Sequence, residues 1–135
     1  GAKFASVDEV IENADVLTLH VPATPATHHM IGAEQFRAMK DSAMLINASR
    51  GPVIDEGALY EALLNHDIAG AALDVYEHEP KVDDGFKSLK NVILTPHIGN
   101  ATVEARDAMA EIVAKNTVAM NKGEKPDYIV NAVTL

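Results

Sequence analysis

The chain has 135 residues, of which 47% are hydrophobic, and its formal net charge is −9 at pH 7. This charge, with three Phe, three Tyr and no Trp, excludes nucleic-acid binding through a basic face or aromatic stacking. Without cysteine or a run of about 18 apolar residues, the sequence predicts a single soluble, cytoplasmic domain that has no disulfides, thiolate metal sites or membrane span.

Helical and strand patterns alternate through the first half of the chain. Ser6 followed by Glu9 is typical of a capping box, and Pro22 ends an apolar run because proline cannot donate to a sheet. The prediction for this half is a helix to residue 13, a strand at 16–21, a loop at 23–29, a helix from 32 or 33 to 40 and a strand at 43–48.

The second half continues this alternation from Asp55, a typical helix N-cap. The prediction is a helix from 55 to about 66, a strand at 69–75, an irregular loop at 77–90, a strand at 92–95, a turn at 96–100, a long helix from Thr102 to Gly123 and an extended tail at 126–135. The long helix carries a stripe that we expect to be core or dimer interface: Met109, Ile112, Val113, Asn116 and Met120.

Near-continuous apolar strands separated by helices predict the α/β class, with βαβ units and a parallel sheet covered on both faces. Four such strands make half of a doubly wound, Rossmann-type domain. No G-x-G-x-x-G motif occurs in the 135 residues, so the strands present correspond to the later ones of such a domain.

Three charged side chains follow three of the predicted strands. Arg50 comes after the strand at 43–48, Glu79 after the strand at 69–75, and His97 after the strand at 92–95. Ligands of open α/β sheets bind at the carboxyl ends of the strands, so we expect these side chains to meet at one site.

Four motifs resemble the D-isomer-specific 2-hydroxyacid dehydrogenases. They are Leu19-His20-Val21-Pro22 with Thr24-Pro25-Ala26-Thr27, Asn47-Ala48-Ser49-Arg50-Gly51, Leu73-Asp74-Val75-Tyr76 with Glu79-Pro80, and Thr95-Pro96-His97-Ile98-Gly99. The resemblance implies that residues 1–135 form a partial NAD(P)-binding domain without the glycine-rich phosphate loop, and that 126–135 lead out of it. It also implies a complete enzyme of about twice this length.

The resemblance implies interconversion of a small 2-oxo acid and a D-2-hydroxy acid. Arg50 suits carboxylate binding because its planar guanidinium stays ionised, and His97 suits proton donation because imidazole titrates near neutral pH. Glu79 beside His97 favours the charged imidazolium. Glu77 is the competing carboxylate, but Pro80 favours an extended Glu79 and the motif places the acid directly before proline, so we expect Glu77 to be solvated.

The resemblance also implies contacts with NAD or NADP, mostly with the nicotinamide side. The residues concerned are Val21, Pro22, Thr27, Ala48, Ser49, Arg50, Asp74, His97, Gly99 and Asn100. Asp74 has an alternative role as a cap for the following loop. The other five histidines have no helical spacing typical of a zinc site, so no metal site is expected.

Two further hypotheses stay open. One is a catalytically silent fragment that self-associates, since the missing phosphate loop would weaken NAD binding and leave apolar surface exposed. The other is a transcriptional corepressor of the same family. For an enzyme, the sequence of the turn at 96–102 is most similar to the glyoxylate and hydroxypyruvate reductase branch, followed by the D-lactate and phosphoglycerate dehydrogenase branches, and a homodimer is expected.

Overall fold

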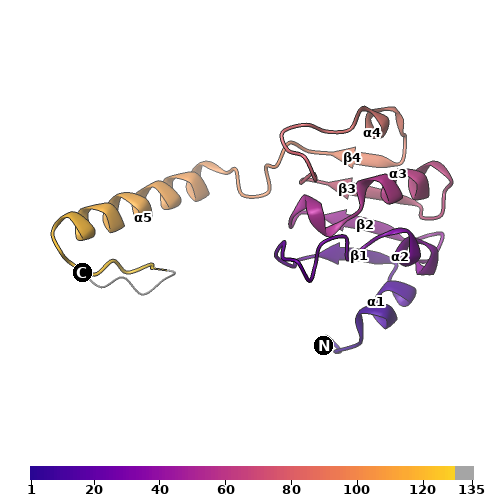
Figure 1. Ribbon diagram of the computed structural model, residues 1–135, viewed down its shortest axis with the longest axis horizontal. Helices are drawn as coiled ribbons and strands as arrows, with labels where there is room; N and C mark the ends of the chain where they lie inside the picture. The colour runs from indigo at the N-terminus through magenta and orange to yellow at the C-terminus, as the bar shows by residue number, and fades with distance from the viewer. Residues whose placement is uncertain (130–135) are drawn as a thin grey trace. The chain divides into compact units, whose positions relative to one another are not determined.

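The computed structural model describes residues 1–129, which fall into two compact units, Gly1–His97 and a second that begins at Ile98. The first unit alternates helices and strands (Figure 1). Its elements are α1 (Val7–Asn13), β1 (Val16–Leu19), α2 (Ala33–Ala38), β2 (Met44–Asn47), the 3₁₀ turn η1 (Gly51–Val53), α3 (Glu56–Leu64), β3 (Gly70–Leu73), α4 (Asp84–Ser88) and β4 (Val92–Leu94).

The four strands form one sheet in the order β1-β2-β3-β4, and every pair is parallel. The α/β class and the parallel sheet are therefore confirmed. The strands are shorter than predicted because the ladder ends before His20, Ala48, Asp74 and Thr95. These residues lie at the carboxyl ends of the strands, where Asp74 and Thr95 each still donate one backbone hydrogen bond to the neighbouring strand, to Asn47 and Leu73.

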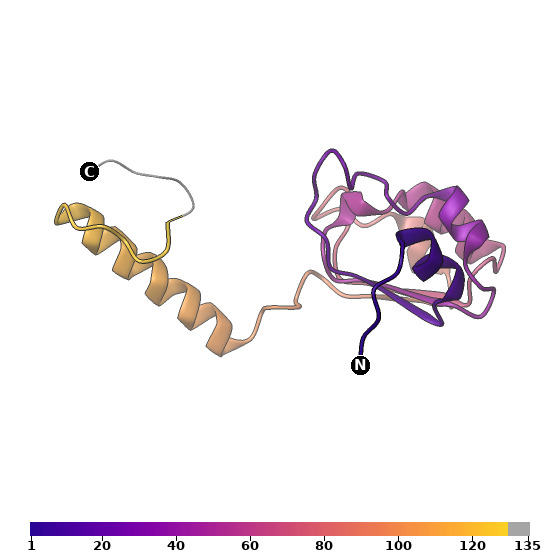
Figure 2. The ribbon, with the colours of Figure 1, turned by 90° about the horizontal axis from the view of Figure 1, so that it is seen from below.

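The prediction that both sheet faces are covered is wrong for the described residues. Leu17, Leu45 and Leu73 are buried on one face, whereas Val16 is 56% exposed and Ile93 is 64% exposed on the other. Figure 2 has α2 and α3 on one side of the sheet. Right-handed crossovers that all step in the same direction place their helices on one face, which explains the difference.

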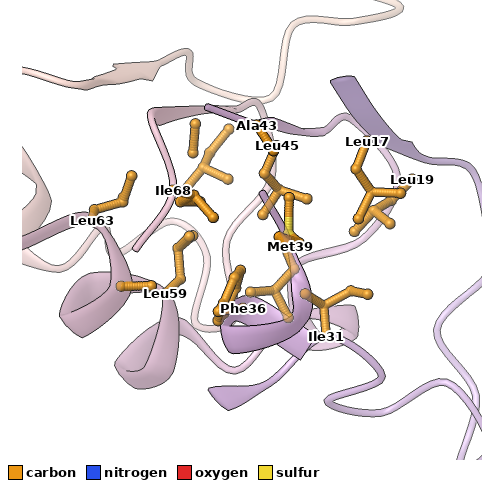
Figure 3. Packing of buried hydrophobic residues seen from close by; sticks show 14 of the residues in the cluster. Leu17, Leu19, Ile31, Phe36, Met39, Ala43, Leu45, Leu59, Leu63 and Ile68 are labelled. Carbon is orange, nitrogen blue, oxygen red and sulfur yellow. The ribbon is translucent and has the colours of Figure 1, made fainter. Parts of the chain in front are cut away.

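The core lies between the sheet and these helices, with side chains that interdigitate (Figure 3). Phe36 and Met39, at 2% and 5% exposure, pack from α2 and its C-cap, as the sequence predicts. Leu59 and Leu63 of α3 complete the helical side. Asp55 caps α3 by accepting a hydrogen bond from the Ala58 N–H at 3.0 Å.

A short helix, α4, corrects the predicted loop at 77–90. Asp83 caps it by accepting the Gly85 N–H at 2.7 Å, and Phe86 is only 1% exposed. Five residues are too few for a helical period to emerge in the sequence, and one buried aromatic side chain anchors the turn.

The second unit contains α5 (Val103–Asn121), which Thr102 caps by accepting the Ala105 N–H at 3.1 Å. Gly123 ends it with φ +73°, as predicted. No residue of α5 is buried among the described residues, and the core or dimer-interface role expected for its apolar stripe stays a prediction. Of the predicted tail at 126–135, residues 130–135 lie outside the described part. None of the helices within residues 1–129 combines the length and apolarity that a bilayer-spanning segment requires.

Candidate active site at the carboxyl edge of the sheet

Asn47, the last residue of β2, shapes the loop that carries Arg50. Its side chain is 1% exposed, and its Oδ1 accepts the Ser49 N–H at 3.0 Å and the Ser49 hydroxyl at 2.9 Å. Its Nδ2 donates to the Arg50 carbonyl at 3.1 Å. A buried amide with all these partners fixes a turn at the strand end, where regular sheet hydrogen bonds stop.

Gly51 brings this turn against the segment that follows β3. A Cβ atom placed on Gly51 would lie 2.0 Å from the carbonyl carbon and oxygen of Tyr76 and 2.4 Å from the Glu77 nitrogen. Only glycine permits two backbones to approach so closely. This contact brings Arg50 to the same edge of the sheet as Glu79.

Glu79 connects the ends of β3 and β4. Its Oε1 accepts the Tyr76 N–H at 2.9 Å, and its Oε2 lies 2.8 Å from His97 Nδ1. The hydrogen bond with His97, followed by the one with Tyr76, lowers the pKa of Glu79, and the positive charge of Arg50 lowers it further. The three predicted catalytic residues therefore interact at one site.

The ionised Glu79 also determines how His97 is oriented. A carboxylate can only accept hydrogen bonds, so Nδ1 of His97 donates in this pair and Nε2 is left for a ligand. His97 has φ +53°, in the left-handed region that few residues other than glycine adopt. A strained backbone at a ligand-facing residue is common in functional sites.

Two hollows open at this edge. One, of about 370 Å³, is lined by Tyr76, Glu79, Pro80, Val82, Pro96 and His97. The other, of about 420 Å³, is lined by His20, Val21, Pro22, Ala48, Ser49 and Arg50. The hollows therefore divide the charged groups, with the acid and the imidazole in one and the guanidinium in the other.

The predicted cofactor residues take different positions. Val21, Pro22, Ala48 and Ser49 line the second hollow, but the Ser49 hydroxyl already donates to Asn47. The Thr27 hydroxyl donates to the Pro22 carbonyl at 2.6 Å and so shapes its own loop.

The remaining predicted cofactor residues lie further along the chain. Asp74 accepts the Thr95 hydroxyl at 2.5 Å. Gly99 and Asn100 belong to the second unit.

Three residues were misjudged or missed from the sequence. Glu77, predicted to be solvated, has a side chain only 18% exposed that lies 2.7 Å from His29 Nε2. His20 and Tyr76 line the two hollows, although no role was predicted for them. His20 directly follows β1 and Tyr76 comes three residues after the end of β3, and this position near a strand end was the available signal.

The second hollow suits the nicotinamide half of a dinucleotide. Apolar Val21, Pro22 and Ala48 would contact a flat ring, and the hollow lies at the carboxyl ends of β1 and β2. The 135 residues contain no glycine-rich phosphate loop, so they provide contacts for only part of such a cofactor.

Known proteins with similar sequences and structures identify the family. Residues 1–99 match the profile described as D-isomer specific 2-hydroxyacid dehydrogenase, NAD binding domain. A protein of Staphylococcus aureus, provisionally named 2-hydroxyacid dehydrogenase, is 55% identical over 131 residues, which are 97% of this chain and 41% of that protein.

Two solved structures extend the comparison. The D-lactate dehydrogenase of Lactobacillus jensenii with NAD⁺ is 39% identical, with a TM-score of 0.85 over 95% of this chain and 43% of that one. The NADPH-dependent glyoxylate/hydroxypyruvate reductase of Sinorhizobium meliloti with NADP and malonate is 36% identical, with a TM-score of 0.82 over 93% of this chain and 42% of that one.

Proposed function

The chain belongs to the D-isomer-specific 2-hydroxyacid dehydrogenase family, and we propose that it serves an enzyme that interconverts a 2-oxo acid and a D-2-hydroxy acid. Since the chain spans 41% of the length of the curated relative, the proposal concerns the complete enzyme, of which residues 1–135 would form the later part of the NAD-binding domain. The observation that supports it most directly is the Glu79–His97 pair beside Arg50.

Arg50 would bind the carboxylate of the substrate. The guanidinium is exposed at the carboxyl edge of the sheet, and its Nη1 donates to the Ser49 carbonyl at 2.6 Å, which restricts its orientation. Its remaining N–H groups suit two parallel hydrogen bonds with a carboxylate. This anchor would set the 2-oxo group at a constant distance from His97.

His97 would supply the proton. When a 2-oxo acid is reduced, its carbonyl carbon gains a hydride and its oxygen gains a proton. With Nδ1 donated to Glu79, the proton transferred would be the one on Nε2. Glu79 would orient the ring through its hydrogen bond with Nδ1. In the reverse reaction, neutral Nε2 would accept the hydroxyl proton.

A nicotinamide cofactor would supply the hydride, and Val21, Pro22, Ala48 and Ser49 would hold its nicotinamide side. Nuclear magnetic resonance titration of this chain shows whether these residues contact the nicotinamide side or the adenine side of the cofactor. Nicotinamide mononucleotide should shift the amide signals of Val21 and Ala48, whereas AMP should leave them unchanged. The assignment fails if AMP shifts them or if nicotinamide mononucleotide does not.

The activity is tested in the complete enzyme with glyoxylate, hydroxypyruvate and pyruvate, each with NADH and with NADPH. We propose glyoxylate or hydroxypyruvate as the preferred substrate class, with either coenzyme. A His97→Gln variant should lose hydride transfer while it still binds the reduced cofactor. Turnover equal to the parent's would contradict the assignment of His97.

We also propose that the protein is a cytoplasmic homodimer. Exposed apolar side chains on α5 support self-association, among them Val113 and Val118 at 64% and 52% exposure. The same surface favours the alternative in which this chain by itself self-associates without catalysis. Sedimentation equilibrium of the chain and of the complete enzyme distinguishes the homodimeric enzyme from self-association of this chain alone. A monomeric complete enzyme would contradict the proposed homodimer.

A further inference from the structure

The fold brings together a second cluster of ionisable side chains, separate from the Glu79–His97 pair. One ligand atom each from His28, His29 and Glu77 lies within 4.8 Å of the other two. His28 and His29 come from the loop after β1, and Glu77 from the segment after β3. Because 48 residues separate His29 from Glu77, no spacing rule applied to the sequence could have paired them.

We propose that His28, His29 and Glu77 bind a divalent transition-metal ion of the zinc type. Two imidazoles and one carboxylate are donors that such ions prefer, and three protein ligands leave a position for water. Ligand atoms around tetrahedral zinc lie about 3.4 Å apart, so side-chain movements of up to about 1.4 Å would bring the three ligand atoms to that separation.

The backbone around this cluster is already restrained. The His29 N–H donates to the Pro52 carbonyl at 2.8 Å, and His29 has φ +49° in the left-handed region. The rings of His28 and His29 stack with centroids 4.0 Å apart. The Glu77 N–H donates to the Glu56 carboxylate at 2.7 Å. The backbone would therefore need little further ordering, but the His28 ring would have to turn out of the stack, because a bound ion lies in the plane of each imidazole that coordinates it.

A second layer of carboxylates supports a cation here. Asp55 Oδ2 lies 3.9 Å from His29 Nδ1, the ring atom opposite the one that faces Glu77. At this distance the Asp55 carboxylate acts on the histidine through its charge and not through a hydrogen bond. A dication would offset the negative charges of Glu77 and Asp55, which flank the His29 ring.

The site would connect two segments that matter for catalysis. Thr27 and Pro22 shape the loop that carries the histidines, and Glu77 lies two residues before Glu79. Without a metal ion, His29 and Glu77 form a hydrogen bond of 2.7 Å between these segments. A bound ion would replace that single bond with three coordinate bonds and restrain the segment that positions Glu79.

Isothermal titration calorimetry of the untagged 135-residue chain with ZnCl₂ tests the proposal. We expect one ion per chain, with a dissociation constant of about 10 µM or tighter. Ca²⁺, which prefers oxygen ligands, should not bind at the same concentration. Equal binding of Ca²⁺, or zinc binding only in the millimolar range, would overturn the proposal.

The variants are chosen to keep the fold. His29→Asn tolerates a positive φ, Glu77→Gln keeps the side-chain length, and Asp55→Asn remains a good helix cap. His29→Asn and Glu77→Gln remove proposed ligands and should weaken zinc binding at least tenfold, whereas Asp55→Asn removes only a nearby charge and should weaken it less. The matched control is His66→Asn, because His66 also has a positive φ, of +59°, but lies beyond the opposite end of α3.

Zinc binding by these variants either supports the proposed site or overturns it. Weaker binding in His29→Asn and Glu77→Gln, together with unchanged binding in His66→Asn, supports the site. Binding like the parent's in the first two, or an equal loss in the control, overturns it. Circular dichroism spectra that match the parent's would establish that each variant is folded.

Discussion

The Glu79 carboxylate lies 2.8 Å from Nδ1 of His97, and the two residues are 18 positions apart in the chain. Each follows a different strand, so their contact depends on the pairing of β3 with β4. The second carboxylate oxygen accepts the Tyr76 N–H, which leaves little freedom for the Glu79 side chain to rotate. This relationship can be tested without any catalytic assay.

The His97→Asn variant should raise the pKa of Glu79 toward its ordinary value of 4.5. The hydrogen bond with His97 is the largest cause of the lowered pKa, and asparagine tolerates the positive φ at this position. Titration of the Glu79 side-chain carbon by nuclear magnetic resonance measures the change. An identical pKa in both proteins would mean that His97 does not hold the carboxylate in solution.

The Glu79→Gln variant should lose less stability than the parent when the solution is acidified. A lowered pKa in the folded state means that the ionised carboxylate stabilises the fold above pH 4.5, and that this contribution disappears as the pH falls through the lower folded value. Urea unfolding at several pH values below 6 measures this difference. The control is Glu34→Gln, whose position on α2 is far along the chain from the site. The prediction is contradicted if the free energy of unfolding falls equally with pH in the parent and in Glu79→Gln.

The Tyr76→Phe variant should lose about 1 kcal/mol of stability. The Tyr76 hydroxyl donates to the Thr95 carbonyl at 2.8 Å, with the Leu73 carbonyl at 3.2 Å, and so joins the ends of β3 and β4. The control is Tyr60→Phe, whose ring packs edge to face on Phe86 in a contact that phenylalanine retains. Denaturant unfolding measures both variants, and equal stabilities would refute a role for the Tyr76 hydroxyl.

The Gly51→Ala variant should lose about 3 kcal/mol or more, because the new methyl group would overlap the Tyr76 carbonyl and the backbones would have to separate. Gly57→Ala within α3 is the matched control. Its nearest neighbour would be the Asp55 Oδ1 atom at 3.3 Å, and alanine favours a helix by up to about 1 kcal/mol. A Gly51→Ala protein as stable as the parent would show that the close approach is not required.

The Arg50→Lys variant of the complete enzyme should lose roughly 2 kcal/mol or more of transition-state stabilisation, measured as kcat/KM. Lysine keeps the charge but cannot form two parallel hydrogen bonds with a carboxylate. Arg37→Lys, in the last turn of α2, should have no effect. Unchanged kcat/KM in Arg50→Lys would exclude Arg50 as the carboxylate anchor.

Much of the fold could be predicted from local patterns. Ser6, Asp55 and Thr102 cap helices as expected, because a side-chain oxygen next to a helical start satisfies free N–H groups whatever its surroundings. The helix α4 was missed because its one buried side chain, Phe86, gives no periodic signal. Coverage of the sheet was misjudged because strand order is not encoded in the hydrophobicity of any strand.

Local patterns in the sequence predicted the order of the strands and of the helices other than α4, and placed Arg50, Glu79 and His97 after three of those strands, since residue spacing and capping are local properties. The tertiary structure alone decided which side chains meet. Glu79 accepts hydrogen bonds from His97 and from the Tyr76 N–H, and the Gly51 backbone packs against that of Tyr76. Glu77 forms a hydrogen bond with His29 instead of facing solvent. These contacts join residues distant in the chain, and parallel strand pairing brings them together at one edge.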